Sequence, residues 1–157
     1  MTEHIPADVL REFTSYSPDL VQNEGAKIIV EMIGNGLINH SYKVSDGQKP
    51  AIFLQRINKN VFRDPRALQE NYTNLWQYAE FEFTGWKMPH PLMFPERDIL
   101  FYDKQGDYWR AFEFISEGIT INVPDTALLA GATANAFARF TAAFEEFNTG
   151  ILKEVIP

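Results

Sequence analysis

The sequence predicts an α+β fold built around a five-stranded antiparallel sheet, and three observations indicate it. Short segments rich in β-branched and aromatic residues are separated by turns that contain glycine. Three other segments repeat apolar residues at the spacing of a helix. The chain has 157 residues, of which 45% are hydrophobic, so it can bury the core of one globular domain.

The first half of the chain predicts one helix and a meander of three strands. Residues 7–16 form the helix, whose apolar face consists of Val9, Leu10, Phe13 and Tyr16. Turns that contain glycine then separate three β-branched segments. We expect these segments to pair in antiparallel order as strands 26–33, 37–44 and 51–57.

The next part predicts a helix, a loop and a hairpin. Asp64-Pro65 is a favourable helix start, because aspartate caps the unpaired amides and proline fits the first helical position. The apolar face of this helix consists of Leu68, Tyr72, Leu75, Trp76 and Ala79. Residues 84–95 contain three prolines and predict a loop. The hairpin that completes the sheet is expected as strands 98–102 and 108–115.

The last helix is expected at residues 127–148, and one of its faces is strongly apolar. This stripe consists of Leu129, Ala136, Phe137, Phe140, Phe144 and Phe147. Burial of each phenylalanine contributes about 1.5–3 kcal/mol, so we expect another surface to cover the stripe. That surface is either the rest of the same domain or a second copy of the chain in a homodimer.

Composition excludes several classes of function. The chain has no cysteine, which rules out disulfides and thiolate metal sites, and its three histidines are scattered. The net charge of −7 argues against nucleic-acid binding. No apolar run reaches the roughly 18 residues of a membrane span, and the acidic N-terminus lacks the pattern of a signal peptide. We therefore expect a cytoplasmic protein without a membrane or nucleic-acid partner.

The turn Gly34-Asn35-Gly36 is the first candidate for a binding site. Glycines between two antiparallel strands let backbone amides approach phosphate oxygens, because no side chain stands between them. Asn-Gly is also a common tight hairpin turn, so taken alone the motif favours a structural role. It is not a Walker loop, because no Gly-Lys-Ser/Thr follows it.

Three segments resemble the aminoglycoside-phosphotransferase and choline-kinase superfamily, and its N-acetylhexosamine kinase branch in particular. They are Gly36-Leu37-Ile38-Asn39-His40-Ser41-Tyr42-Lys43-Val44, Phe53-Leu54-Gln55-Arg56-Ile57-Asn58 and Val61-Phe62-Arg63-Asp64-Pro65. The resemblance extends over nearly the whole chain. It implies a protein-kinase-like, nucleotide-binding small lobe in residues 1–115. Residues 116–157 would then be the hinge and the first helix of a large lobe, and the full-length relative would use ATP and Mg²⁺.

The resemblance also implies where a nucleotide would bind. The loop over the ATP phosphates would contain Gly34, Asn35, Gly36 and Asn39. The Glu113 carbonyl would accept a hydrogen bond from adenine, and the Ile115 N–H would donate one. Backbone recognition of this kind leaves no side-chain signature, so an ordinary buried strand predicts the same sequence pattern.

The strand and helix that normally provide an ion pair near the phosphates depart from the family pattern. Gln55 occupies the strand position where relatives carry lysine or arginine, and Arg56 is open to either a nucleotide contact or a surface position. On the following helix, the apolar stripe places Asn71 inward and Glu70 in solvent. We expect a neutral contact between Gln55 and Asn71 instead of the ion pair.

The sequence lacks the residues that would catalyse phosphoryl transfer in this family. Phosphoryl transfer in this fold needs an aspartate that orients the acceptor and groups that hold magnesium. After Gly118 the acids are Asp125, Glu145, Glu146 and Glu154, and no histidine follows. We expect the N-terminal ATP-binding lobe of a sugar or small-alcohol kinase that ends before the catalytic loop and is inactive alone. The alternatives are a non-catalytic nucleotide-binding or dimerisation module and, third, an unrelated α+β domain.

Overall fold

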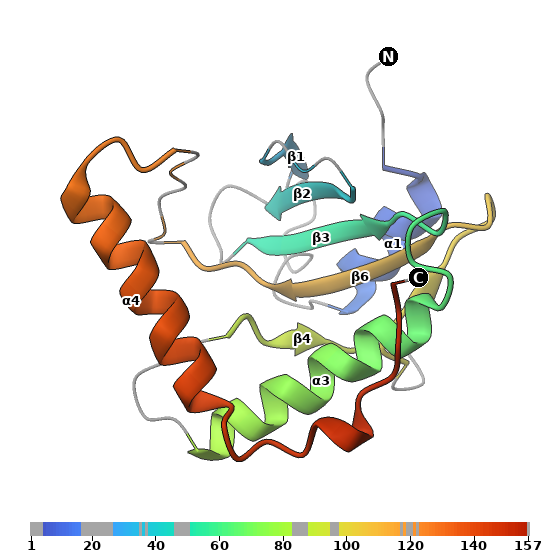
Figure 1. Cartoon of the computed structure of the whole chain (residues 1–157). Coiled ribbons are helices and arrows are strands. Elements are labelled where there is room, and N and C mark those ends of the chain that lie inside the picture. Colours follow the sequence, from blue (N-terminus) through green and yellow to red (C-terminus); the bar gives the residue numbers. More distant parts are fainter. Residues whose placement is uncertain are drawn as a thin grey trace.

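The computed structural model has an α+β architecture, as the sequence predicts, with three helices and a six-stranded antiparallel sheet in the described residues (Figure 1). It describes residues 5–16, 27–34, 36, 38–45, 51–82, 88–94, 98–116, 118, 121 and 123–156. The helices are α1 (Ala7–Tyr16), α3 (Pro65–Glu82) and α4 (Ala127–Ala143). The strands are β1 (Ile29–Met32), β2 (His40–Ser45), β3 (Ile52–Ile57), β4 (Pro91–Leu92), β5 (Phe101–Tyr102) and β6 (Tyr108–Glu113).

The sheet is open, and β3 and β6 lie at its centre. The strand order is β1-β2-β3-β6-β4, and β5 pairs with β6 beside this path. The register sets Tyr42 opposite Leu54, and Leu54 opposite Ala111. Because neighbouring strand residues point to opposite faces, this register fixes which side chains share each side of the sheet.

The expected number of five strands is wrong, because β4 lies within the stretch predicted as a loop. Pro91 and Leu92 pair with Phe112 and Ala111 of β6. Proline lacks an N–H, but an edge strand tolerates it because one side of the strand has no partner. The hairpin strand expected from residue 98 begins instead at Phe101, and the Leu100 amide before it donates to the Asp98 side chain at 3.3 Å. Asp98 also forms a bidentate ion pair with Arg66 at 2.9 and 3.0 Å.

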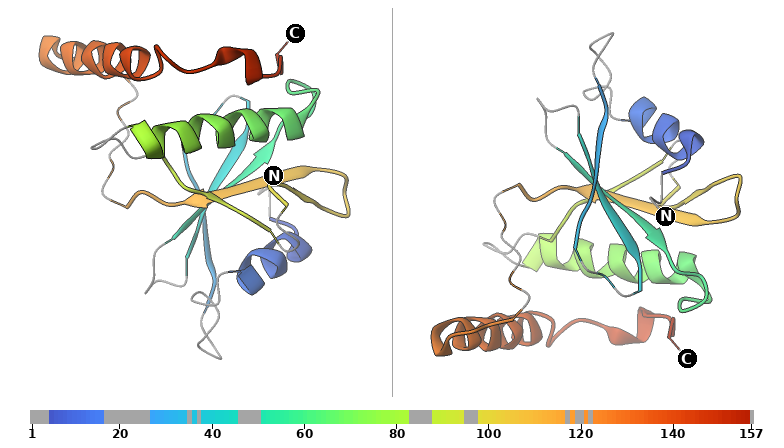
Figure 2. Two further views of the ribbon diagram at one scale, coloured as in Figure 1. Left: turned by 90° about the horizontal axis from the view of Figure 1, so that it is seen from below. Right: turned by 90° about the horizontal axis from the view of Figure 1, so that it is seen from above.

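Helices cover both faces of the sheet, and Figure 2 shows α1 on one face and α3 on the other. The α1 face holds the larger core, in which a helical stripe meets alternate residues of the central strands. Its buried members are Ile5, Val9, Phe13, Tyr42, Val44, Ile52, Leu54, Phe94, Trp109 and Ala111. The helix bounds match the prediction for residues 7–16.

The other face of the sheet packs against α3. The Asp64 carboxylate accepts a hydrogen bond from the Ala67 N–H at 2.9 Å, which confirms the predicted cap. A smaller core at one end of this helix joins Ile57, Phe62 and Leu100. Further along, Tyr72 meets Phe112 edge to face at 4.7 Å between ring centroids.

The C-terminal part of the chain lies on the outer side of α3, so this helix is enclosed between the sheet and the C-terminal segment (Figure 2). The last helix ends at Ala143 rather than near residue 148, because the chain turns and brings Phe147 against Tyr78 at 5.1 Å. A short 3-10 helix, η2 (Thr149–Ile151), follows. Phe147 is buried, whereas Phe137 of the same predicted stripe is 70% exposed.

The turn between β5 and β6 is held by a buried aspartate. Asp103 is 2% exposed. Its carboxylate accepts hydrogen bonds from the indole of Trp109 at 2.6 Å and from the amides of Gln105 and Asp107 at 2.9 and 2.8 Å. Trp109 is also a fully buried core residue. Asp103 therefore connects the turn to the main core.

We expect Asp103→Ala to lower the free energy of unfolding by about 3 kcal/mol, because it leaves buried donors without acceptors. Urea unfolding followed by tryptophan fluorescence would measure the change. Asp125→Ala is the matched control, since Asp125 is exposed and its loss should change stability by less than about 0.5 kcal/mol. Equal unfolding midpoints for the two variants would contradict this role of Asp103.

Candidate functional site

The backbone geometry of the turn between β1 and β2 favours glycine at two positions. Gly34 has a φ angle of 74°, in the left-handed region that other residues adopt at a cost. At Gly36, an added Cβ would lie 3.0 Å from the carbonyl oxygen of Asn39. The Ile33 amide donates to the Ser41 carbonyl at 2.9 Å and continues the ladder into the turn. Asn35, the remaining predicted residue of this loop, lies outside the described residues.

Asn39 connects this turn to β3. Its side-chain oxygen accepts a hydrogen bond from the Asn58 amide at 2.9 Å. Its side-chain nitrogen donates to the Gln55 oxygen at 3.4 Å. Two residues that the resemblance implies for phosphate binding, Asn39 and Gln55, are therefore in contact.

Gln55 is the centre of a polar cluster on the α3 side of the sheet. Its amide nitrogen donates to the Ser41 hydroxyl at 2.9 Å. Its amide oxygen accepts two hydrogen bonds from the Arg110 guanidinium, from Nη2 at 2.6 Å and from Nε at 2.9 Å. We call the residues Asn39, Ser41, Gln55, Gln69 and Arg110 the amide cluster.

Arg110 extends the amide cluster to α3. Its Nη1 donates to the Gln69 side-chain oxygen at 3.3 Å. Burial lowers the pKa of the Arg110 guanidinium to about 10, a shift that the nearby Tyr72 opposes, so the group stays cationic at neutral pH. Gln69 is fully buried, and its amide nitrogen has no hydrogen-bond partner among the described residues.

The prediction that Asn71 faces the sheet is wrong. Its side-chain amide instead exchanges two hydrogen bonds with the backbone of Lys153, at 2.7 and 2.9 Å. Glu70, expected in solvent, forms an ion pair with the Lys153 ammonium. On this helix the residue directed at the sheet is Gln69.

The sequence contained a signal for Gln69 and Arg110 that an apolar stripe misses. Gln69 precedes Tyr72, Trp76 and Ala79 at spacings of three, seven and ten residues, which place it on the same helix face. Arg110 alternates with its neighbours in β6 and so shares a face with Phe112, whose ring it approaches at 5.2 Å. Both positions are recognised only when polar residues are allowed on an inward face.

Arg56 lies on the opposite side of the sheet from Gln55. Its guanidinium is 3.6 Å from the Asp107 carboxylate, which also pairs with the Lys59 ammonium at 3.0 Å. Arg56 is therefore not part of the amide cluster. Of the neighbouring residues Gln55 and Arg56, only Gln55 faces α3, because strand residues alternate between the two faces of the sheet.

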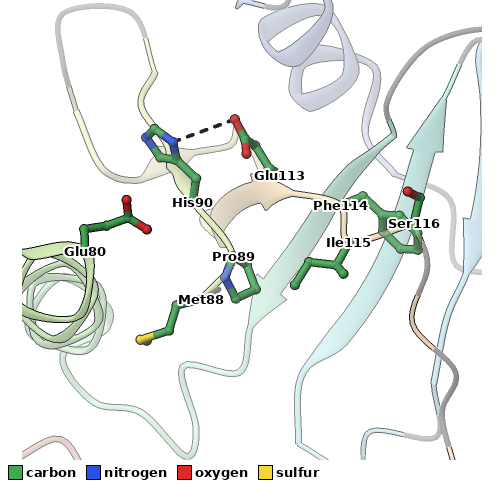
Figure 3. A pocket seen from close by; sticks show the side chains of 8 residues that line it. All are labelled: Glu80, Met88, Pro89, His90, Glu113, Phe114, Ile115 and Ser116. Atoms are coloured by element: carbon green, nitrogen blue, oxygen red, sulfur yellow. Dashed lines mark ion pairs between the residues drawn. The ribbon is translucent and has the colours of Figure 1, made fainter. Parts of the chain in front are cut away.

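The chain segment after β6 lines a groove of about 560 Å³ (Figure 3). Its lining consists of Glu80, Met88, Pro89, His90, Glu113, Phe114, Ile115 and Ser116. The Glu113 amide donates to the His90 carbonyl at 2.9 Å, and the Phe114 amide donates to the Ala51 carbonyl at 3.1 Å. Among the described residues, Ile115 belongs to this groove, whereas Gly34, Gly36 and Asn39 do not line it.

One side of the groove is shaped by aromatic and charged contacts. His90 stacks on Trp76 of α3, with 4.5 Å between the ring centroids. The His90 imidazole lies 3.7 Å from the Glu113 carboxylate, as the dashed line in Figure 3 marks. Ile115 lines the groove and is 51% exposed.

These features define an α+β domain with an open antiparallel sheet, a polar cluster under one face and a groove at the end of its central strand. No family model matches the chain, and a search of curated proteins found no match. The described residues contain no group of three or more acidic or histidine side chains placed to hold a metal ion. None of the helices in that part of the chain is long and apolar enough to span a bilayer.

We expect Gly34→Ala to destabilise the fold by about 1–2 kcal/mol, because alanine is strained at a φ of 74°. Gly131→Ala provides a matched control. An added Cβ at Gly131 meets no atom within 4 Å, and alanine should stabilise helix α4 by about 0.5–1 kcal/mol. Chemical denaturation of both variants would test this, and a Gly34→Ala variant as stable as the wild type would refute the left-handed turn.

Proposed function

We propose that the chain is the nucleotide-binding lobe of a phosphotransferase that acts on a sugar or another small alcohol. The observation that carries this proposal is the link between the glycine turn and β3, which Asn39 makes through Gln55 and the Asn58 amide. The link holds the turn next to a cluster of hydrogen-bond donors on the α3 side of the sheet. A glycine turn held beside such donors is suited to phosphate groups.

The order of elements supports the same function. A glycine turn between two antiparallel strands is followed by a third strand and by a helix on the sheet. A strand then leads into an irregular connector at residues 114–116. This order is the one that the sequence resemblance implies for a kinase-like small lobe.

The groove at the end of β6 supports an adenine site. Its volume of about 560 Å³ is in the range of small-molecule pockets. The described residues provide no hydrogen-bond partner for the Ile115 N–H, which leaves it available to a base. Glu113 and Arg110 are three residues apart on β6, or about 10 Å at roughly 3.3 Å per strand residue. An extended nucleotide can bridge this spacing from base to phosphates.

The described residues do not fit Mg²⁺, which the resemblance implies together with ATP. Magnesium is held mainly by carboxylates, water and phosphate oxygens. The amide cluster offers amide oxygens and a hydroxyl but no carboxylate. We therefore assign no residue of this site to the metal, and the proposal is limited to nucleotide binding.

We expect the 157-residue chain to bind adenosine, and Ile115→Pro to weaken binding about tenfold, because it removes one N–H donor. Ile115→Val is the control, since it keeps the donor and should bind as the wild type does. Titration calorimetry would measure both, with circular dichroism as the check on folding. Failure of the wild type to bind adenosine or ATP would refute the nucleotide site.

We also expect no turnover of ATP by this chain with Mg²⁺ and a panel of sugars. The sequence contains no His-x-Asp loop after residue 118 to orient an acceptor hydroxyl. A coupled assay for ADP would test this. Metal-dependent ADP formation by the pure chain would contradict it, provided that Gly34→Ala abolishes the activity.

A second candidate function, pairing of two chains, is favoured by the exposed apolar surface of α4. Phe137 is 70% exposed, and Phe140, on the same face of the helix, is 40% exposed. Arg139 is the single charged residue of this helix, so two copies can meet without strong repulsion despite the net charge of −7. A helix that is apolar over most of its surface is stable only when something covers it.

If α4 mediates pairing, light scattering should give the mass of a dimer, and Phe137→Asp should convert it to a monomer. Asn135→Asp is a matched control, because it adds the same charge to the same helix 200° away from Phe137. A wild-type protein that is monomeric at all accessible concentrations would exclude this second function. Dissociation of both variants would show that charge on α4, and not the Phe137 face, controls pairing.

A further inference from the structure

Arg110 carries a largely buried positive charge without an acidic partner among the described residues. Its guanidinium makes three hydrogen bonds, all of them to the side-chain oxygens of Gln55 and Gln69. Buried cations are normally paired with carboxylates, because desolvation of an unpaired charge is costly. The chain has 21 acidic and 14 basic residues, so its composition supplies enough carboxylates for such a pair. At this position, however, both partners are neutral amides.

The amide cluster has more donors than acceptors. A guanidinium has five N–H groups, and the three hydrogen bonds to the glutamines leave two for another partner. The amide nitrogen of Gln69 is also buried and has no partner among the described residues. A group with several acceptor oxygens would satisfy these donors, and a negative charge would compensate the guanidinium.

Solvent reaches part of the cluster. Gln69 is fully buried at the α3 end of the cluster. The other members are each partly exposed, namely Asn39, Ser41, Gln55 and Arg110. A ligand would therefore reach Arg110 before it reaches Gln69. The proposed function assigns this partly exposed end of the cluster to the phosphates of the nucleotide.

We propose that the amide cluster is an anion subsite in which Arg110, supported by Gln69, binds phosphate oxygens of the ligand. The inference rests on the proposed function for the identity of the ligand as a nucleotide phosphate. The cation that the β3 position lacks, because Gln55 stands there, is then provided by the neighbouring strand β6. The planar fork of arginine suits this task, since it can bind two phosphate oxygens at once.

Gln69 has a positioning role in this arrangement. Its oxygen holds Nη1 of Arg110. As a neutral partner it orients the guanidinium without neutralising it. A glutamate at this position would form a buried ion pair with Arg110 and would repel an incoming anion. Gln69→Glu thus separates the proposed role from a merely structural one, because it should stabilise the fold while it weakens anion binding.

The test is calorimetric titration of the full chain with tripolyphosphate at low salt. Wild type should bind, and Arg110→Gln and Gln69→Glu should each bind at least about tenfold more weakly, since a charge-assisted hydrogen bond is lost or opposed. Arg139→Gln is the matched control, because it removes the same charge from the exposed surface of α4 and should change affinity less than about twofold. Thermal unfolding of every variant would establish that it is folded.

The outcomes separate this inference from the proposed function. Equal tripolyphosphate affinity for wild type, Arg110→Gln and Gln69→Glu would overturn the subsite, as would the absence of binding to wild type. A rise in thermal stability of Gln69→Glu with unchanged anion affinity would also overturn it. Adenosine tests the nucleotide assignment separately, because it has no phosphate and should bind Arg110→Gln as it binds the wild type. Tripolyphosphate binding without adenosine binding would support the anion subsite and count against the nucleotide.

Discussion

The alternation of Trp109 and Arg110 in β6 is the constraint on which both sides of the structure depend. β6 pairs with β3, β4 and β5, so its orientation fixes the orientation of the central sheet. Trp109 points into the α1 core, where its indole bonds to Asp103. Arg110 therefore points to α3 and bonds to Gln55 and Gln69. A large apolar core on one face thus determines where the charge lies on the other.

The enclosure of α3 on two sides explains why its polar residues are distributed as they are. Gln69 faces the sheet, whereas Asn71 and Glu70 bond to Lys153 of the C-terminal segment. Gln69 bonds to a guanidinium and Asn71 to backbone groups, so these two amides fix the rotation of the helix together with its apolar residues.

Much of the fold could be predicted from the sequence, because the helix at residues 7–16, the Asp64 cap and the central strands follow simple periodicity. The strand at Pro91–Leu92 could not, since two residues of which the first is proline carry no strand pattern and pair only because β6 is next to them. An apolar stripe predicts Asn71 as the inward residue of α3, because it ignores glutamine. Gln69 and Arg110 face one another across the sheet–helix interface and share a hydrogen bond, a relation between distant positions that local periodicity does not contain.

The bonds between Lys153 and α3 also define a mechanical path through the molecule. The Asn71 side-chain amide donates to the Lys153 carbonyl and accepts from the Lys153 N–H. The Lys153 ammonium forms an ion pair with Glu70. Gln69 lies one and two positions before these residues on the same helical turn. A load applied to residues 152–156, for example by a tether or an attached partner, is therefore carried into the turn of α3 that contacts Arg110.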